Sequence, residues 1–149
     1  MINPNSLFGA LDISASGMSA ERFRMEVVAN NIANSQTSLD KNGEPFRRKQ
    51  VVFQTQFNET MNQLRDVEGA QTLGGVRVVE VVPDMSDLKE VYLPGHPHAN
   101  QEGIVRMPNV HLPNEMVDLV SATRVYEANL KAIQSFKQMV EQSLQLLRA

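Results

Sequence analysis

Hydrophobic positions toward the C-terminal end of the chain recur in alternating steps of three and four residues. The series is Met116, Leu119, Thr123, Tyr126, Leu130, Ile133, Lys137, Val140, Leu144 and Leu147. This spacing is the heptad seam of an amphipathic helix. Asn114 can cap the helix start, and neither Pro nor Gly occurs between Asn114 and Ala149. The pattern therefore predicts one uninterrupted helix of about 50 Å, although one long helix of an ordinary bundle would show the same stripe.

The N-terminal segment carries a seam of the same spacing. Its positions are Phe8, Leu11, Ala15, Met18, Arg22, Met25, Ala29 and Ile32, and only Arg22 is polar. Two helices with matching stripes can pair as a coiled coil. Small residues crowd positions 10–20, which allows close helix approach but also makes this segment a poor helix in isolation. The three Asn residues within Asn30–Asn34 favour a helix end there.

Between the two seams the hydrophobic period shifts toward two, which is typical of half-exposed strands. One strand is predicted from Phe46 to Phe57, and a second over Gly75–Val82, where Pro83 ends it because proline cannot donate to a ladder. A third, short strand is predicted over Gly103–Met107. Residues 35–45 are predicted to form a loop, and residues 58–69 fit either a short helix or a loop.

These patterns predict an α+β fold with long N- and C-terminal helices paired as a coiled coil and a small β-rich central domain. Residues 1–34 and 114–149 are expected to form the helical domain, and residues 35–113 the β-rich domain with its loops. We expect Leu11, Met18, Met25 and Ile32 to face the C-terminal seam within the chain. Further apolar positions, namely Val120, Phe136, Met139 and Leu146, form a second stripe that could meet a neighbouring subunit.

Composition and charge exclude several classes of function. The chain has a formal net charge of -3, and its longest block of like charge is Arg47–Lys49, so no surface suited to nucleic acid is expected. The absence of Cys excludes disulfides and thiolate metal sites. No unbroken apolar run reaches the length of a membrane span, and the first basic residue is Arg22, so neither a membrane-spanning segment nor a cleaved secretory signal is expected.

The residues that could carry chemistry form no recognisable constellation. His96, His98 and His111 could hold a divalent metal, but the first two lie in a Pro- and Gly-rich loop without helical ligand spacing. A metal-dependent hydrolase built on these histidines is therefore the weaker hypothesis. Glu115 and Asp118, like Glu127 further along, are interpreted as helix-dipole partners and solvated surface charges. We predict no catalytic residue, no cofactor or metal and no small-molecule substrate.

Several motifs resemble a known family. Asp12–Met18 followed by Asn30–Asn34 is similar to the N-terminal signature of axial proteins of the bacterial flagellar rod and hook. The segments that narrow the resemblance to proximal rod proteins of the basal body are Gly43–Phe53, Pro94–Pro97, Met107–Val110, Asn114–Asp118 and Ser121–Asn129. The resemblance extends over nearly the whole chain. The segment Asn58–Ala70 is longer than in shorter family members and is expected to be a feature of the outer surface.

The resemblance implies a structural subunit of a helical tube in the periplasm that transmits torque and forms part of the export channel. It implies export by the flagellar type III system without a cleaved signal. The implied partners are further copies of the chain, other rod proteins and the base adaptor of the export gate. The family-motif residues are Asn30, Asn31, Asn34, Asn114, Glu115 and Met116. The residues predicted to form the coiled-coil and assembly interface are Phe8, Leu11, Ala15, Met18, Met25, Ile32, Met116, Leu119, Val120, Tyr126, Leu130, Ile133, Phe136, Val140, Leu144 and Leu147.

A second hypothesis comes from a different class of protein. A soluble coiled-coil adaptor that forms a small cytoplasmic oligomer would carry the same two apolar stripes. Fractionation distinguishes the two, because a rod subunit co-purifies with basal bodies and an adaptor stays in the cytosol.

Overall fold

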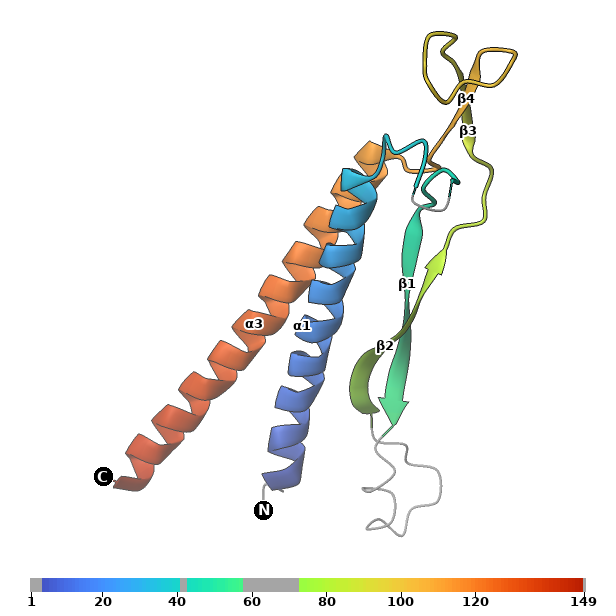
Figure 1. Ribbon diagram of the computed structural model, residues 1–149. Coiled ribbons are helices and arrows are strands. Elements are labelled where there is room, and N and C mark those ends of the chain that lie inside the picture. Colours follow the sequence, from blue (N-terminus) through green and yellow to red (C-terminus); the bar gives the residue numbers. More distant parts are fainter. Residues whose placement is uncertain (1–3, 41–42, 58–72, 149) are drawn as a thin grey trace. The chain divides into compact units, whose positions relative to one another are not determined.

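The computed structural model describes residues 4–40, 43–57 and 73–148 of the chain. Its elements are α1 (Pro4–Ala33), β1 (Lys49–Phe57), β2 (Leu73–Pro83), β3 (Lys89–Tyr92), β4 (Ile104–Met107) and α3 (Leu112–Arg148) (Figure 1). β1 pairs with β2, and β3 pairs with β4, in separate two-stranded sheets. The long terminal helices and the small sheets between them confirm the predicted α+β class. The predicted Asn58–Ala70 segment and the side chains of Phe8 and Leu147 lie outside the described part.

Several elements differ from the sequence expectations. β2 runs from Leu73 to Pro83, so Pro83 belongs to the strand that it was predicted to end. α3 begins at Leu112, before Asn114, and it accommodates Pro113 because the first turn of a helix needs no backbone donor there. β1 begins at Lys49, and Phe46 lies before it as a buried side chain. The sequence pattern does not predict β3, because this strand has four residues and only Val91 among them is partly buried.

The chain forms two compact units, and each takes residues from both ends of the sequence. The first unit comprises Met1–Phe23, Phe53–Val79 and Ala122–Ala149, and the second comprises Arg24–Val52 and Glu80–Ser121. Both helices therefore contribute one part to each unit. The sequence-based division into a helical domain and an outer domain, like the coiled-coil pairing, stays a prediction.

In the first unit β2 lies against α1 at Gly75. The backbone φ of Gly75 is +101°, and a side chain at this position would collide with the Ser16 hydroxyl. That hydroxyl accepts a hydrogen bond from the Val76 N–H at 3.1 Å and donates one to the Ile13 carbonyl at 2.7 Å. Gly17 follows Ser16 on α1, and a Cβ added at Gly17 would lie 2.9 Å from Nδ2 of Asn129 on α3. Because Ser16 and Gly17 are small, β2 and α3 can both pack close to α1 at this point.

We expect Gly75→Ala to lower the free energy of unfolding by about 1–3 kcal/mol, because it combines a positive φ with a steric collision. Gly95→Ala is the matched control, since Gly95 has an ordinary φ and no atom within 4 Å of an added Cβ. Urea denaturation followed by circular dichroism measures both variants. Equal stability of the two variants would contradict the close approach of β2 to α1.

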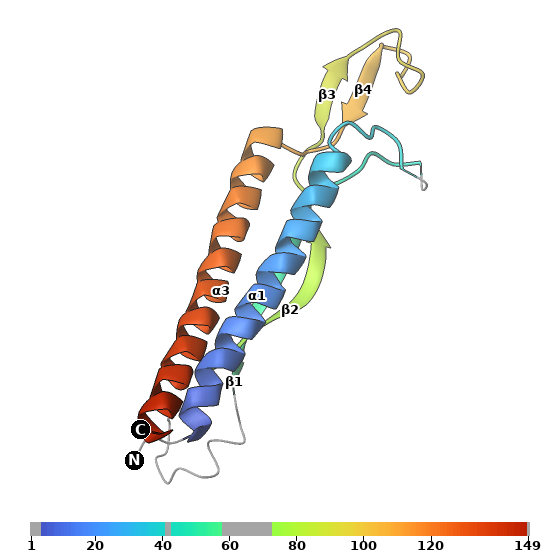
Figure 2. The ribbon, with the colours of Figure 1, turned by 90° about the vertical axis from the view of Figure 1, so that its left-hand side faces the viewer.

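The second unit contains the β3–β4 hairpin, whose two strands lie side by side in Figure 2. The strands pair antiparallel, with Lys89 opposite Met107 and Tyr92 opposite Ile104. Val105 of β4 is almost fully buried and belongs to the small core of this unit. In the loop between the strands, the Asn100 side chain accepts a hydrogen bond from the Ile104 N–H at 2.8 Å, which holds the loop end in place.

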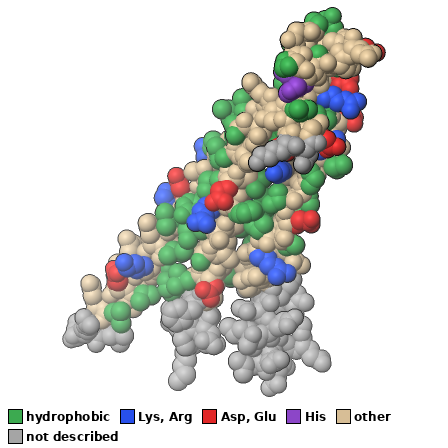
Figure 3. Space-filling model, in the orientation of Figure 1, with side chains coloured by type: hydrophobic (Ala, Val, Ile, Leu, Met, Phe, Trp, Pro, Cys, Tyr) green, Lys and Arg blue, Asp and Glu red, His purple; other side chains and the backbone are tan. Residues whose placement is uncertain are grey.

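Along α3 the covered positions also alternate by four and three, but they follow a seam shifted from the predicted one. The covered and partly covered positions of this series are Glu115, Leu119, Ala122, Tyr126, Asn129, Ile133, Phe136 and Val140. Half of this series coincides with the predicted seam. Met116, Leu130 and Leu144 are exposed within the single chain, at 55%, 39% and 54%, and Figure 3 shows hydrophobic side chains at the surface among charged ones.

On α1 the most buried described side chains are Ala20, Val28 and Asn31 rather than the predicted stripe. Of the predicted stripe, Leu11, Met18, Met25 and Ile32 are half-buried, whereas Ala15 is exposed. Their role in an interface with other chains stays a prediction.

Candidate functional site

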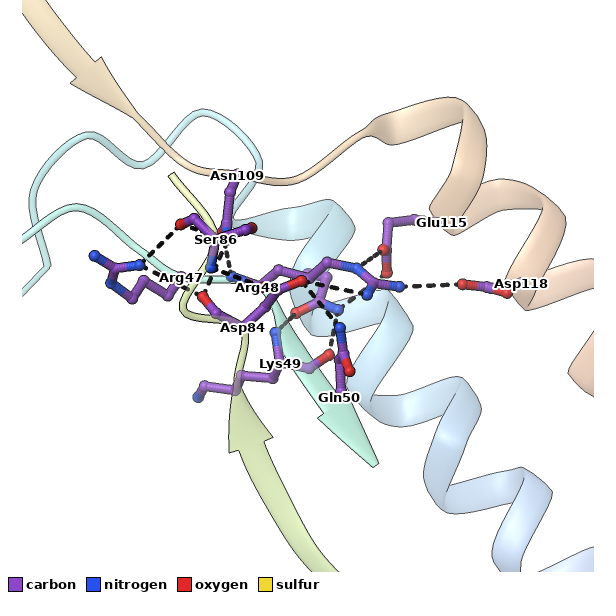
Figure 4. A network of polar contacts seen from close by, with 10 residues as sticks. Arg47, Arg48, Lys49, Gln50, Asp84, Ser86, Asn109, Glu115 and Asp118 are labelled. Carbon is purple, nitrogen blue, oxygen red and sulfur yellow. Dashed lines mark hydrogen bonds and ion pairs between the residues drawn. The ribbon is translucent and has the colours of Figure 1, made fainter. Parts of the chain in front are cut away.

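The second unit holds a buried polar network where the end of α1 meets the start of α3 (Figure 4). Asn31 lies in the last turns of α1, Glu115 lies in the first turn of α3, and both side chains are 0% exposed. Nδ2 of Asn31 donates a hydrogen bond to Oε2 of Glu115 at 3.0 Å. Burying a polar group without a partner is costly, and each of these two side chains gives the other a partner. The contact joins residues that are 84 positions apart in the sequence.

Arg48, just before β1, supplies the positive charge of the network. Its Nε donates to Oε1 of Glu115 at 2.5 Å, and its Nη2 donates to Oδ2 of Asp118 at 3.3 Å. Asp118 also accepts a hydrogen bond from Arg24 at 3.3 Å. A buried carboxylate is tolerated when it is paired and hydrogen-bonded. Glu115 therefore depends on Arg48 and Asn31 together.

The network also fixes the backbone of the strand entry. Oδ1 of Asn31 accepts from the Lys49 N–H, and its Nδ2 donates to the Lys49 carbonyl, both at 2.9 Å. The Asn31 amide thus bonds to Lys49 as a neighbouring strand would. These two bonds satisfy the N–H and the carbonyl of Lys49.

Asn109, in the connection from β4 to α3, makes a second set of backbone contacts. Its Oδ1 accepts from the Arg48 N–H at 2.8 Å, and its Nδ2 donates to the Asp84 carbonyl at 3.1 Å and to the Ser86 hydroxyl at 2.8 Å. The Asp84 N–H in turn donates to the Arg48 carbonyl at 2.7 Å. Three segments that are distant in sequence are therefore held around Arg48.

The charges shift two pKa values in the network. Burial disfavours the charge on Arg48, but the hydrogen bond and charge of Glu115, together with the charges of Asp118 and Asp84, outweigh burial and raise the pKa of Arg48. Hydrogen bonds from the backbone and side chain of Ser86 lower the pKa of Asp84, and the charge of Arg48 adds a smaller effect in the same direction. Both groups are therefore held in their charged forms.

The depressed pKa of Asp84 predicts a specific acid sensitivity. Because its folded pKa lies below the unfolded value of 3.8, this carboxylate stabilises the fold above about pH 4, and the contribution is lost as pH falls through the folded pKa. We expect the stability difference between the wild type and Asp84→Asn to shrink as pH falls from about 5 to about 3. Ser86→Ala should remove part of the same pH-dependent difference. Urea titrations at several pH values measure it, and a difference independent of pH would contradict the assignment.

A surface groove of about 890 Å³ adjoins the network in the second unit. Its lining residues are Arg48, Asp84, Ser86, Asp87, Lys89, Pro108, Asn109, Val110, His111, Asn114, Glu115, Val117 and Asp118. Within the described part of the chain, no three His, Cys, Asp or Glu side chains gather as a metal site. The groups of this network are paired with one another, and the arrangement is structural in character.

The structure separates the family-motif residues into two groups. Asn31 and Glu115 meet in the network, whereas Asn114 and Met116 are exposed on α3. Asn34 donates from its side chain to the Asn30 carbonyl at 2.8 Å, which agrees with the predicted helix end. Arg48, Asn109 and Asp118 also lie in segments that carry the family resemblance, but no local pattern in those segments predicts their contacts.

One interpretation of the carboxylates is wrong. Glu115 is not a solvated surface charge, because its side chain is fully buried and bonded to Arg48 and Asn31. Its position in the first turn still places it near the positive end of the helix dipole. Sequence reasoning also missed Arg48 and Asn109, since a polar residue beside a strand is usually solvated and neither has a partner nearby in the sequence.

Two of the three histidines lie together, and the described residues around them form no metal site. His96 and His98 pack edge to face with their ring centroids 5.2 Å apart, and Nδ1 of His98 is 2.9 Å from the Ser38 hydroxyl. His111 is exposed and lines the groove. Within the described residues no helix is both long and apolar enough to cross a membrane.

Comparison with protein families places both ends of the chain among flagellar rod proteins. One family model, described as flagella basal body rod protein, matches residues 11–38. A second, described as flagellar basal body rod FlgEFG protein C-terminal, matches residues 101–146. Both models describe proteins of the bacterial flagellar rod, and they cover the ends of the chain where the sequence predicts the helices.

Curated relatives narrow the class. The flagellar basal-body rod protein FlgC of Bacillus subtilis is 44% identical over 147 residues, covering 93% of this chain and 97% of the relative. FlgC of Aquifex aeolicus is 42% identical over 139 residues, covering 93% and 96%, and FlgC of Borreliella burgdorferi is 38% identical over 149 residues, covering 95% and 98%. The chain therefore belongs to the FlgC family of flagellar basal-body rod proteins, as the motifs indicated. Members of this family are structural proteins and not enzymes.

Proposed function

We propose that this chain is a subunit of the proximal part of the rod, where it assembles with copies of itself and with other rod proteins into a helical tube. Membership of the FlgC family supports a structural role in the basal body. Contacts between subunits that do not close into a ring generate a helical assembly. In this proposal, torque passes through packed helices, so rigidity and register matter more than chemical reactivity.

The observation that carries this proposal is the row of exposed apolar side chains on α3. Met116, Leu130 and Leu144 recur at two-heptad intervals, and each is more than one-third exposed within the single chain. Exposed apolar side chains that recur along a helix of 37 residues need a covering surface. A neighbouring helix of the assembly would supply that surface.

The proposal also concerns how the chain is arranged in the rod, where it is located in the cell and how it is exported. We infer that the terminal helices pair as a coiled coil in an inner domain, that the tube forms part of the export channel, and that the chain contacts the base adaptor of the export gate. We also infer a periplasmic location, reached by the flagellar type III system without a cleaved signal. The motif resemblance supports these inferences, and each of them can be tested separately.

Fractionation tests the proposed function directly. Expressed at its natural level in a flagellated cell, a tagged chain is expected to co-sediment with detergent-extracted basal bodies. The control is the same strain without the flagellar export apparatus, in which the chain should remain in the cytosolic fraction. Recovery from the cytosol of both strains as a small oligomer would instead support the soluble coiled-coil adaptor.

A further inference from the structure

The contact between Asn31 and Glu115 is a polar point within a helix pairing whose stripes are otherwise rich in apolar residues. Both side chains are fully buried. The Asn31 amide bonds to Glu115 and to both backbone groups of Lys49, and each carboxylate oxygen of Glu115 has a donor. The cluster of Asn31, Arg48 and Glu115 is therefore satisfied in one arrangement of the three segments that carry it.

Apolar stripes by themselves define the register of two helices weakly. A shift of one heptad replaces one apolar residue by another and retains much of the buried area, whereas a single buried polar residue selects one register. One heptad after Glu115 stands Ala122, and one heptad before Asn31 stands Arg24. A one-heptad shift of α3 would present the Ala122 methyl to Nδ2 of Asn31 and remove the acceptor from Arg48.

We propose that Asn31, Arg48 and Glu115 form a register lock, which sets the axial position of α3 residues 112–121 against α1 residues 24–33 within the second unit. The lock includes a third segment, because Asn31 bonds to the Lys49 backbone and Arg48 precedes the strand. The strand entry closes onto the helices only when they are in the native register. The proposal does not depend on rod assembly.

Burial of the cluster favours a role in register over a role in stability. Replacement of a buried ion pair by apolar residues of similar volume is often neutral or stabilising, provided that both partners are replaced together. Apolar replacement should therefore leave the two helices paired. The replacement should remove the free-energy difference between the native register and the shifted registers.

Spin-label distances in the purified full-length chain test this proposal. The chain has no native Cys, so Ala33→Cys on α1 and Ser121→Cys on α3 place labels at two exposed positions of the second unit. In the native background a single distance is expected. In the triple variant Asn31→Leu, Arg48→Met, Glu115→Leu, a second population should appear, with its axial offset changed by about 10 Å for a one-heptad slip.

The matched control removes an exposed ion pair from the same unit. Arg106→Met with Glu90→Leu eliminates a pair at 3.6 Å whose side chains are largely solvent-exposed, and a single distance should remain. A single unchanged distance in the triple variant would overturn the proposal. If the triple variant does not fold, the same spin-label distances are measured in the single variant Asn31→Leu. A second distance in that variant supports the register lock, and a single distance refutes it. Unfolding of both variants would mean that the cluster supplies stability rather than register, which also refutes it.

Discussion

Replacing Arg48 by Met is expected to lower the free energy of unfolding by about 3–5 kcal/mol. The loss follows from what remains, because Glu115 is fully buried and would lose its hydrogen bond and ion pair with Arg48 while it keeps the hydrogen bond from Asn31. Removal of one partner from a buried ion pair costs more than removal of both. Urea denaturation at neutral pH measures the effect.

Arg47 provides the matched control for this substitution. It is the preceding residue, it is also partly buried, and it donates to the main-chain carbonyls of Ser86 at 3.1 Å and Asp84 at 3.5 Å. Because these acceptors are neutral, Arg47→Met is expected to cost about 1 kcal/mol. Similar losses for the two arginines would contradict the central place of Arg48.

A double-mutant cycle measures the interaction energy between Arg48 and Glu115 separately from their contacts with other residues. Arg48→Met combined with Glu115→Met removes both charges, so the double variant should be more stable than the sum of the two single losses predicts. The expected coupling is about 1–3 kcal/mol. Additive losses would indicate that each side chain acts through other neighbours, such as Asp118 for Arg48.

The sequence predicted the elements of this fold better than it predicted their contacts. Periodicity is a local property, so α1, α3 and the strands β1, β2 and β4 could be read from the alternation of apolar residues. β3 is too short to show a period. On α3, Leu119 and Tyr126 belong both to the predicted seam and to the series of covered positions, and the predicted interface itself stays a prediction.

The polar network could not be predicted from the sequence for a physical reason. The contact between Asn31 and Glu115 joins residues 84 positions apart, and Arg48 reaches Glu115 across 67 positions. Each residue also has an ordinary local explanation, since Asn suits a helix end and Glu suits the first turn of a helix. Only tertiary structure distinguishes a solvated first-turn Glu from a buried one. The family motif did include Asn31 and Glu115, but nothing in the motif indicated that they bond to each other.

Leu130→Lys is expected to abolish swimming while leaving the folded chain nearly as stable as before. Leu130 is 39% exposed in the single chain and belongs to the same row as Met116 and Leu144. A charge at this position should therefore change the free energy of unfolding by about 1 kcal/mol or less. In an assembly that covers the row, the same ammonium group would be buried without a partner, which is far more costly.

Swimming in soft agar and electron microscopy of purified basal bodies measure this effect, and thermal unfolding of the purified variant measures stability. Gln134→Lys is the matched control, since Gln134 is an exposed polar residue one turn further along α3. Ile133→Ala gives the opposite profile, because Ile133 is half-buried within the chain and its truncation should lower stability by about 2 kcal/mol. Normal rods and normal swimming in both Leu130→Lys and Met116→Lys would show that the exposed row is not an assembly surface. The covering of α3 would then have to be sought on another of its faces.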